Sequence, residues 1–331
     1  MNREVKMRAM IRERYGEPAK VLKLKEIARP EAGEGQVLVR VHAAGLHRGD
    51  CFVVRGKPFL MRMATGWLKP KVASPGFDVA GVVEAVGSGV TGFAPGDEVF
   101  GSTEGASGAC AEFALAKASG LAHKPGNISF EEAAAVPTSA LAALHGLRAG
   151  GLQAGQRLLI NGASGGVGSF AVQIGKALGA EVTGVCSTKN LEMVRTLGAD
   201  RVVDYTHVDF AKGSDTYDLI LDNVENRSLS DIRRTLRPQG TALLNSGTGA
   251  SGLKLMWRLA KPMLLGPFVS QNLKRYLSVP KPEDLEVLRS MLEEGQITPA
   301  VEQVFALEDV VEAFGRLCTG HAAGKIVLRV G

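Results

Sequence analysis

The sequence predicts an α/β protein with two domains, one small and rich in β-strands and one built on a doubly wound parallel sheet. Between residues 157 and 247, apolar runs alternate with segments of helical character, and the runs themselves do not alternate polar with apolar residues. Runs of that kind are typical of parallel strands buried on both faces. Residues 36–42, QVLVRVH, alternate instead, as a strand with one face in water does. With 331 residues, 45% of them hydrophobic, the chain is long enough for two packed cores.

The residues before 124 supply the β-rich domain. Short strands broken by glycine and proline turns are expected at 36–42, 78–90, 96–102 and 110–116. Further along, Ser129 and Glu132 make a capping box that begins an alanine-rich helix. This helix leads toward the second domain.

The stretch 157–168, RLLINGASGGVG, carries the strongest functional signal, because an apolar strand runs into a glycine-rich turn and then a helix. Glycines let the backbone approach phosphate oxygens, and the positive end of the helix dipole attracts the anion. Against G-x-G-x-x-G the match is Ala163, Gly165 and Gly168, so the first glycine is missing. The turn predicts the pyrophosphate site of a dinucleotide at six consecutive residues: Ala163, Ser164, Gly165, Gly166, Val167 and Gly168.

The tip of the next strand, 181–186, should distinguish the two nicotinamide cofactors. An acidic residue there would accept hydrogen bonds from a free ribose 2′-hydroxyl, but the chain offers Ser187, Thr188 and Lys189. Two hydroxyl donors and a cation suit a 2′-phosphate, so NADPH is favoured over NADH. The alternative interpretation is that these residues only cap the following helix, and both roles can hold together.

The rest of this half repeats the β-α pattern. Strands are expected at 201–205, 217–224 and 241–247, with a helix at 228–240. In a doubly wound sheet the ligand lies at the carboxyl ends of the strands. We therefore expect four residues to face the nicotinamide half of the cofactor: Asn223, Val224, Ser246 and Gly247.

After Pro280 the chain is expected to return to the β-rich domain. We expect a helix at 284–295, an extended piece at 297–305, a second helix at 310–318 and a last strand at 325–330. The predicted boundaries are 1–123 with 281–331 for the discontinuous β-rich domain, and 124–280 for the nucleotide-binding domain.

Composition and charge exclude several classes of function. The net charge of +5 is spread without a basic run of five or six residues, which indicates anionic small ligands and argues against nucleic-acid binding. The apolar runs are too short to span a bilayer and the first ten residues lack a signal-peptide core, so we expect a cytoplasmic protein. The cysteines include no CxxC pair, and we expect reduced thiols at Cys51, Cys110, Cys186 and Cys318.

Three segments together resemble a known family. Residues 76–101, the turn ASGGVG and the tail GHAAGKIVLRV look like the medium-chain dehydrogenase/reductase superfamily, specifically its zinc-free quinone-oxidoreductase-like branch. The resemblance covers nearly the whole chain and implies a GroES-like catalytic domain beside a Rossmann domain. Where zinc alcohol dehydrogenases carry Gly-His-Glu, this chain reads Gly76-Phe77-Asp78, and the four-cysteine structural lobe is absent. We therefore expect no metal site.

The resemblance also implies cofactor contacts. The turn residues would touch the pyrophosphate, and Ser187, Lys189 and Tyr205 would surround the adenosine phosphate. Tyr205 could equally be an ordinary aromatic residue packed at a strand end. From the tail, His321, Ala322 and Lys325 fall where relatives touch the cofactor, although Gly320 and Gly324 could mark a mere turn.

The candidate catalytic residues are His47 and Asp50, in AGLHRGD. Zinc-dependent relatives have a cysteine ligand at the position of His47, and the quinone-reductase branch usually has asparagine. The functional interpretation is that His47 donates to a substrate carbonyl, with Asp50 orienting the ring. The alternative is a loop histidine paired with Asp50 that does no chemistry.

Two segments, 54–72 and 251–273, combine Met, Leu, Phe and Trp with Lys and Arg. A broad apolar substrate pocket, a basic patch on a membrane surface, and dimer contact or core packing all remain open for them. The whole pattern predicts a homodimeric, zinc-independent oxidoreductase that transfers hydride from NADPH to quinones or α,β-unsaturated carbonyls. The alternatives are a non-catalytic NADPH-sensing or partner-binding protein of the same fold, and a zinc alcohol dehydrogenase.

Overall fold

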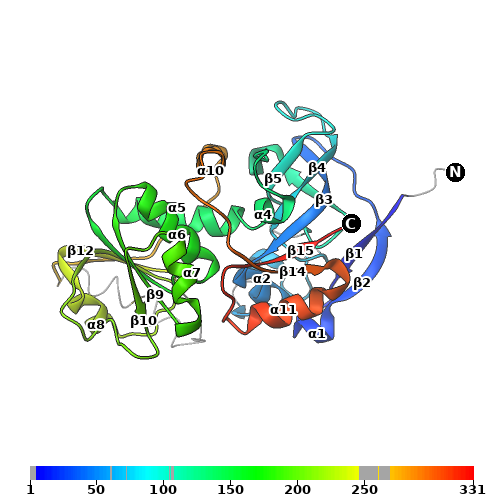
Figure 1. Cartoon of the computed structure of the whole chain (residues 1–331). Helices are drawn as coiled ribbons and strands as arrows, with labels where there is room; N and C mark the ends of the chain where they lie inside the picture. Colours follow the sequence, from blue (N-terminus) through cyan, green and yellow to red (C-terminus); the bar gives the residue numbers. More distant parts are fainter. Residues whose placement is uncertain are drawn as a thin grey trace. The chain divides into compact units, whose positions relative to one another are not determined.

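The computed structural model describes residues 5–59, 62–71, 73–103, 105, 108–245, 260 and 269–331. The predicted site residues Ser246 and Gly247 and most of segment 251–273 lie outside the described residues. The chain divides into two compact units (Figure 1). The first unit comprises Met1–Leu141, Pro280–Gly295 and Pro299–Gly331, and the second comprises Ala142–Val279 and Gln296–Thr298.

The first unit is built on a seven-stranded sheet in the order β14-β15-β3-β4-β5-β7, with β6 paired to β3. Its strands are β3 (Gln36–Leu46), β4 (Asp78–Val86), β5 (Glu98–Ser102), β6 (Phe113–Lys117), β7 (Leu121–His123), β14 (Val301–Ala306) and β15 (Lys325–Arg329). A separate antiparallel pair joins β1 (Lys6–Ile11) to β2 (Lys23–Ala28). In β3 the valines at positions 37, 39 and 41 are buried, but Leu38 between them is only 1% exposed, so the predicted alternation does not hold there.

Short helices accompany this sheet. They are α1 (Pro18–Val21), α2 (Arg48–Arg55), α3 (Arg62–Thr65), α4 (Phe130–Ala134), α10 (Pro282–Glu293) and α11 (Val310–Cys318), with 3₁₀ turns η3 (Ala118–Gly120) and η6 (Leu307–Asp309). The predicted capping box is present, since the Ser129 side chain accepts from the Glu132 N–H and the Glu132 carboxylate accepts from the Ser129 N–H. It begins only the short α4, and α5 (Pro137–Gly150) follows as a separate helix that starts in the first unit and ends in the second.

The second unit is a six-stranded parallel sheet in the order β10-β9-β8-β11-β12-β13. Its strands are β8 (Arg157–Asn161), β9 (Glu181–Cys186), β10 (Arg201–Asp204), β11 (Tyr217–Asp222), β12 (Leu236–Leu244) and β13 (Asn272–Lys274). Its helices are α6 (Gly166–Ala177), α7 (Leu191–Thr196) and α8 (Leu229–Arg234), with η4 (Thr188–Asn190). The chain runs outward from β8 to β10 and then returns to β11 on the other side of β8. This order is the doubly wound topology, with its switch point between β8 and β11.

The prediction of a helix through Gly240 is wrong beyond Arg234. Helix α8 ends there and β12 begins at Leu236, which pairs with Tyr217 of β11. Pro238 has no N–H to continue a helix, and Gln239 adopts a positive φ of 67°. The backbone therefore breaks and enters the sheet earlier than the apolar pattern indicates.

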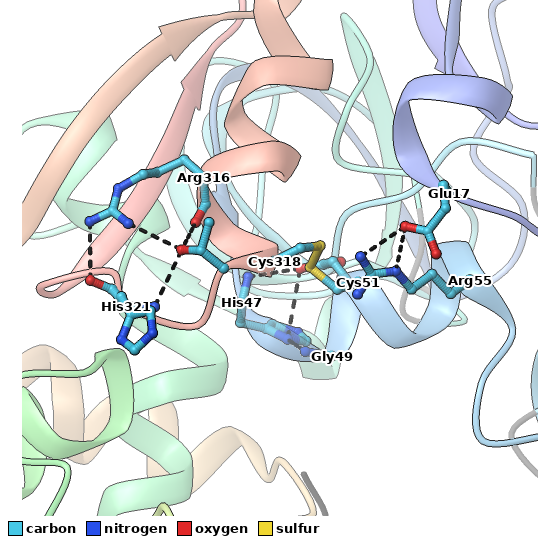
Figure 2. Close-up of a disulfide and its surroundings, with 10 residues drawn as sticks. Glu17, His47, Gly49, Cys51, Arg55, Arg316, Cys318 and His321 are labelled. Atoms are coloured by element: carbon cyan, nitrogen blue, oxygen red, sulfur yellow. Dashed lines mark hydrogen bonds and ion pairs between the residues drawn. A yellow bond between two sulfur atoms is a disulfide. The ribbon is translucent and has the colours of Figure 1, made fainter. Parts of the chain in front are cut away.

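The expectation of four reduced thiols is wrong for two of them. Cys51 of α2 and Cys318 of α11 form a disulfide, with their Cα atoms 6.1 Å apart (Figure 2). A separation of 267 residues hides this pairing in the sequence, because only the packing of the two helices brings the cysteines within bonding range. Cys110 and Cys186 are buried free thiols. In the described ranges, no helix is long and apolar enough to cross a membrane.

Candidate functional site

The glycine-rich turn lies between β8 and α6 in the second unit. A Cβ on Gly168 would lie 2.1 Å from the carbonyl oxygen of Gly162, so the start of α6 packs directly against the backbone of the turn. Gly162 itself has a φ of +83°, which favours glycine. At Gly165 the nearest atom to a Cβ would be 3.5 Å away, so this side of the turn is open. The glycines therefore have two roles: Gly162 and Gly168 shape the turn, and Gly165 leaves room for a ligand.

The open side of this turn fits a phosphate group. Gly165 is the N-cap of α6 and supplies no side-chain acceptor, and the first N–H groups of a helix have no intrahelical partner. Ala163 is fully buried, and its N–H donates to Val185 of β9 at 2.9 Å. The Ser164 hydroxyl accepts from the Asn190 side chain at 2.9 Å, which ties the turn to the end of η4. Ala163 and Ser164 thus position the turn, and the backbone N–H groups after Gly165 are available to an anion.

The tip of β9 presents the residues predicted to read a 2′-phosphate. Ser187 is the N-cap of η4, yet its side chain makes no capping hydrogen bond. Lys189 is exposed. The ring of Tyr205 is 43% exposed, and its N–H donates to the Cys186 carbonyl at 3.0 Å, so Tyr205 sits beside this tip. Ser187, Lys189 and Tyr205 therefore gather at one corner of the sheet.

Thr188 differs from its neighbours because its hydroxyl is engaged within the protein. It donates to the Asp204 carboxylate at 2.6 Å, and this bond holds the pKa of Asp204 below its ordinary value. Asp204 also accepts from the Thr206 hydroxyl at 2.7 Å. Asp204 thus lies at the end of β10, the strand next to β9, and both of its carboxylate oxygens are hydrogen-bonded.

A buried polar cluster lies at the carboxyl ends of β8 and β11. The Asn161 side chain donates to Asp222 at 2.7 Å, and the same Asp222 oxygen accepts from the Glu225 N–H at 2.7 Å. Burial raises the pKa of Asp222. Asn223 accepts from Asn245 at 2.8 Å, but its own Nδ2 is buried and has no partner among the described residues. An unpaired buried donor at the strand ends is a candidate contact for the polar groups of a nucleotide.

Asn161 and Asp222 were not among the predicted site residues. The signal that could have found them is a polar residue ending each of two apolar strands, because neighbouring parallel strands bring such residues together. Val224, which was predicted to face the nicotinamide, is 37% exposed in this cluster, and its N–H donates to Asp222 at 3.1 Å.

In the first unit, His47 is the N-cap of α2. Its Nδ1 accepts from the Gly49 N–H at 2.9 Å, which assigns the proton of the neutral ring to Nε2. That Nε2 is buried and has no partner in the described structure. The ring centroid lies 4.5 Å from that of Phe77, in a tilted arrangement. The imidazole is therefore held by its other nitrogen and by an aromatic neighbour, with one donor unused.

Asp50 supports the backbone of this loop. Its Oδ2 accepts from the His47 N–H at 2.8 Å and lies 3.7 Å from Nδ1, and its Oδ1 is buried with no partner in the part of the chain that the structure describes. Burial raises the pKa of the Asp50 carboxyl. Asp50 thus contacts the main chain of His47, whereas a direct bond to the ring had been expected.

The predicted tail residues differ in their surroundings. Lys325 is 1% exposed, and its ammonium lies 3.3 Å from Asp78 and 3.2 Å from the Ser139 hydroxyl. His321 is exposed, and its carbonyl accepts from Arg316 at 3.1 Å (Figure 2). Ala322 is half-buried beside it. Lys325 is thus part of a buried ion pair, whereas His321 and Ala322 are at least partly accessible.

The residues in the described ranges contain no group of three or more His, Cys, Asp or Glu side chains that could hold a metal ion. Phe77 and Asp78 stand where the zinc alcohol dehydrogenases have the His and Glu of their Gly-His-Glu motif. The Phe77 ring packs against His47, and Asp78 pairs with Lys325.

Two family models match the chain. Residues 33–146 match the alcohol dehydrogenase GroES-like domain, and residues 197–328 match a domain described as zinc-binding dehydrogenase. Among curated relatives, 2-methylene-furan-3-one reductase of Solanum lycopersicum is 34% identical over 93% of this chain and 75% of its own length. The chloroplastic NADPH-dependent alkenal/one oxidoreductase of Arabidopsis thaliana is 33% identical over 97% of this chain and 79% of its own length.

Among solved structures, the quinone oxidoreductase of Coxiella burnetii matches with a TM-score of 0.86 and 28% identity, over 99% of this chain and all of that one. The chain belongs to the quinone-oxidoreductase-like branch of the medium-chain dehydrogenase/reductase superfamily. The predicted family is therefore confirmed, as is the fold class of a GroES-like domain with a Rossmann domain.

Proposed function

We propose that this member of the superfamily transfers hydride from NADPH to quinones or α,β-unsaturated carbonyls, without a metal ion. The observation that carries the proposal is the buried, unpartnered Nε2–H of His47, held in place by its Nδ1. A donor of this kind suits a substrate oxygen on which negative charge develops. The names of the relatives, a furanone reductase, an alkenal/one oxidoreductase and a quinone oxidoreductase, agree with that class of substrate.

The second unit supplies the proposed NADPH site. The N–H groups after Gly165 bind the pyrophosphate, and Ser187, Lys189 and Tyr205 surround the 2′-phosphate. The unpaired Nδ2 of Asn223 is proposed as a contact at the nicotinamide end. From the tail, His321 and Ala322 remain proposed contacts. We leave Lys325 out, because its ammonium is buried against Asp78 and Ser139.

When bound, NADPH supplies the hydride. His47 donates through Nε2 to the enolate or quinol oxygen, and Asp50 fixes the loop by accepting from the His47 N–H. The hydrogen bond from this donor stabilises negative charge more strongly than it would in water, because the donor is shielded from solvent. We propose that His47 keeps its proton in this hydrogen bond and that water supplies the single proton that completes the reduction.

Turnover tests the proposal directly. The full chain should oxidise NADPH when quinones and enones are offered, as followed by the absorbance of the reduced nicotinamide. The alternative of an NADPH-sensing protein predicts binding without turnover on the whole panel.

Metal independence is tested on the same assay. Chelator-treated protein should keep its activity and its melting temperature, since Phe77 occupies the position of the metal-ligating histidine in the zinc relatives. Stoichiometric zinc whose removal abolishes turnover would support the alcohol dehydrogenase alternative.

Three further expectations stay predictions. They are the homodimer, the cytoplasmic location, and the domain boundaries at 1–123 with 281–331 and 124–280. Light scattering on the purified chain measures the first of these.

A further inference from the structure

A surface of the first unit exposes several large apolar side chains close together. They lie on segment 57–71, which follows α2 and includes α3. Leu68 is 85% exposed, Met63 65%, Trp67 56% and Phe59 54%. The Phe59 and Trp67 rings contact each other edge to face, with their centroids 4.8 Å apart. Exposed apolar residues are ordinary when scattered singly, but a cluster of this size marks an interaction surface.

The charge around these residues has one sign. From Cys51 to Phe77 the sequence has no Asp or Glu and five basic residues: Arg55, Lys57, Arg62, Lys69 and Lys71. Arg55 pairs with Glu17 at 2.9 Å. Lys57, Lys69 and Lys71 are exposed, and no carboxylate in the described part of the chain lies within ion-pair distance of them. Segment 57–71 is therefore both apolar and basic.

Several polar groups beneath this surface are hydrogen-bonded to one another. The Tyr15 hydroxyl donates to the Gly66 carbonyl at 2.6 Å, and Arg62 donates to the Gly56 carbonyl at 3.0 Å while its guanidinium stacks over the Tyr15 ring. The Lys71 N–H donates to the Thr65 carbonyl at 2.8 Å. These bonds hold the described part of the segment on its inner side, and the side chains of Phe59, Met63, Trp67 and Leu68 are left exposed.

We propose that segment 57–71 binds the surface of a membrane containing anionic phospholipid. Trp and aliphatic side chains are favoured at the boundary between headgroups and acyl chains, and nearby Lys residues are attracted to lipid phosphates. A second copy of the chain fits less well, because a two-fold contact through this surface would place its unpaired lysines against those of the partner. The inference does not depend on the proposed reaction.

Vesicle co-sedimentation of the full chain tests this inference. The unmodified protein should bind vesicles of phosphatidylcholine with phosphatidylglycerol, not bind vesicles of phosphatidylcholine alone, and be released by salt. Each lysine near an anionic surface contributes about fivefold in affinity, so Lys69→Gln with Lys71→Gln should weaken binding about 25-fold. Trp67→Ser with Leu68→Ser should weaken it by at least about tenfold.

Matched controls use exposed residues elsewhere on the chain. Lys20→Gln with Lys212→Gln makes the same change in net charge, and Leu277→Ser removes a leucine that is 83% exposed. Both should bind vesicles as the unmodified protein does, and circular dichroism should show every variant folded.

Three results would overturn the inference: no binding to the anionic vesicles at low salt, equal binding to both vesicle types, or variants of segment 57–71 that bind like the controls. Self-association that Trp67→Ser abolishes would assign the surface to a second copy instead.

Discussion

The two candidate binding regions, the tip of β9 and the start of α2, differ in the solvent exposure of their polar groups. At the tip of β9, Lys189 and Tyr205 are exposed, whereas at the start of α2 the Asp50 carboxyl and the Nε2 of His47 are buried. Exposed charges are screened by salt and add modest increments to affinity. A buried donor acts in a weaker dielectric, so its loss has a larger effect. The tip should therefore tune cofactor choice, and the His47 loop should control turnover.

The largest effect is expected at His47. His47→Ala should lower kcat by roughly 10- to 1000-fold, the scale of one lost donor to a developing oxyanion, with NADPH affinity unchanged. His47→Asn should recover part of the loss, because its side-chain amide can donate a hydrogen bond to the same oxygen. Steady-state rates on a quinone and an enone measure both variants. An alanine variant as fast as the unmodified protein would make His47 a loop residue only.

The glycine turn offers a matched pair of variants. Gly168→Ala should lower the free energy of unfolding by about 1–3 kcal/mol, because its methyl group meets the Gly162 carbonyl. Gly165→Ala should change it by less than about 0.5 kcal/mol, since its φ of −80° suits alanine, yet weaken NADPH binding at least about tenfold by occupying the phosphate position. Urea unfolding and calorimetric titration distinguish them. Unchanged NADPH affinity in Gly165→Ala would place the phosphates elsewhere.

A smaller effect is expected at the tip of β9. The unmodified protein should prefer NADPH to NADH by roughly 10- to 100-fold, and Lys189→Ala should raise the NADPH dissociation constant about tenfold while leaving NADH nearly unchanged. The effect should grow at low salt, because Lys189 is exposed. Lys212→Ala, another exposed lysine, is the control. Equal affinities for both cofactors in the unmodified protein would contradict the assignment.

The smallest effects concern pH, and the two regions should differ in sign. Asp50 has a raised pKa, so the folded state keeps a proton that the unfolded state has lost, and stability falls as pH rises from 3.8 through the raised pKa. Asp204 has a lowered pKa, so its contribution is present above 3.8 and is lost as pH falls through the lowered pKa.

Urea unfolding across this pH range tests both signs. The stability of Asp50→Asn relative to the unmodified protein should increase with rising pH, and that of Asp204→Asn should decrease. The same sign for both variants would contradict this assignment.

Much of the fold could be predicted because its signals are local. A few consecutive residues are enough to recognise each of these features: the continuous apolar runs of β8, β9 and β11, and the glycines after Asn161. Contacts between distant segments carry no such signal. The Cys51–Cys318 bond, the pairing of Lys325 with Asp78, and the meeting of Asn161 with Asp222 all depend on packing between elements far apart in the chain.

The candidate site shows the same division. The residues of the glycine turn and of the β9 tip follow one another in sequence, so their shared location could be expected. The role of Asp50 could not be predicted. A carboxylate three residues after His47 can accept a hydrogen bond from either its ring or its main-chain N–H, and the spacing does not distinguish the two.

The disulfide also changes the covalent topology of the chain. By joining Cys51 to Cys318 it closes a ring that contains every residue of the second unit and leaves residues 1–50 and 319–331 outside the ring. A protease that cuts this ring once opens it but releases no fragment, so nicked protein keeps its full mass until the bond is reduced. Both ends of the chain thus stay attached to each other through sulfur when the backbone between them is broken.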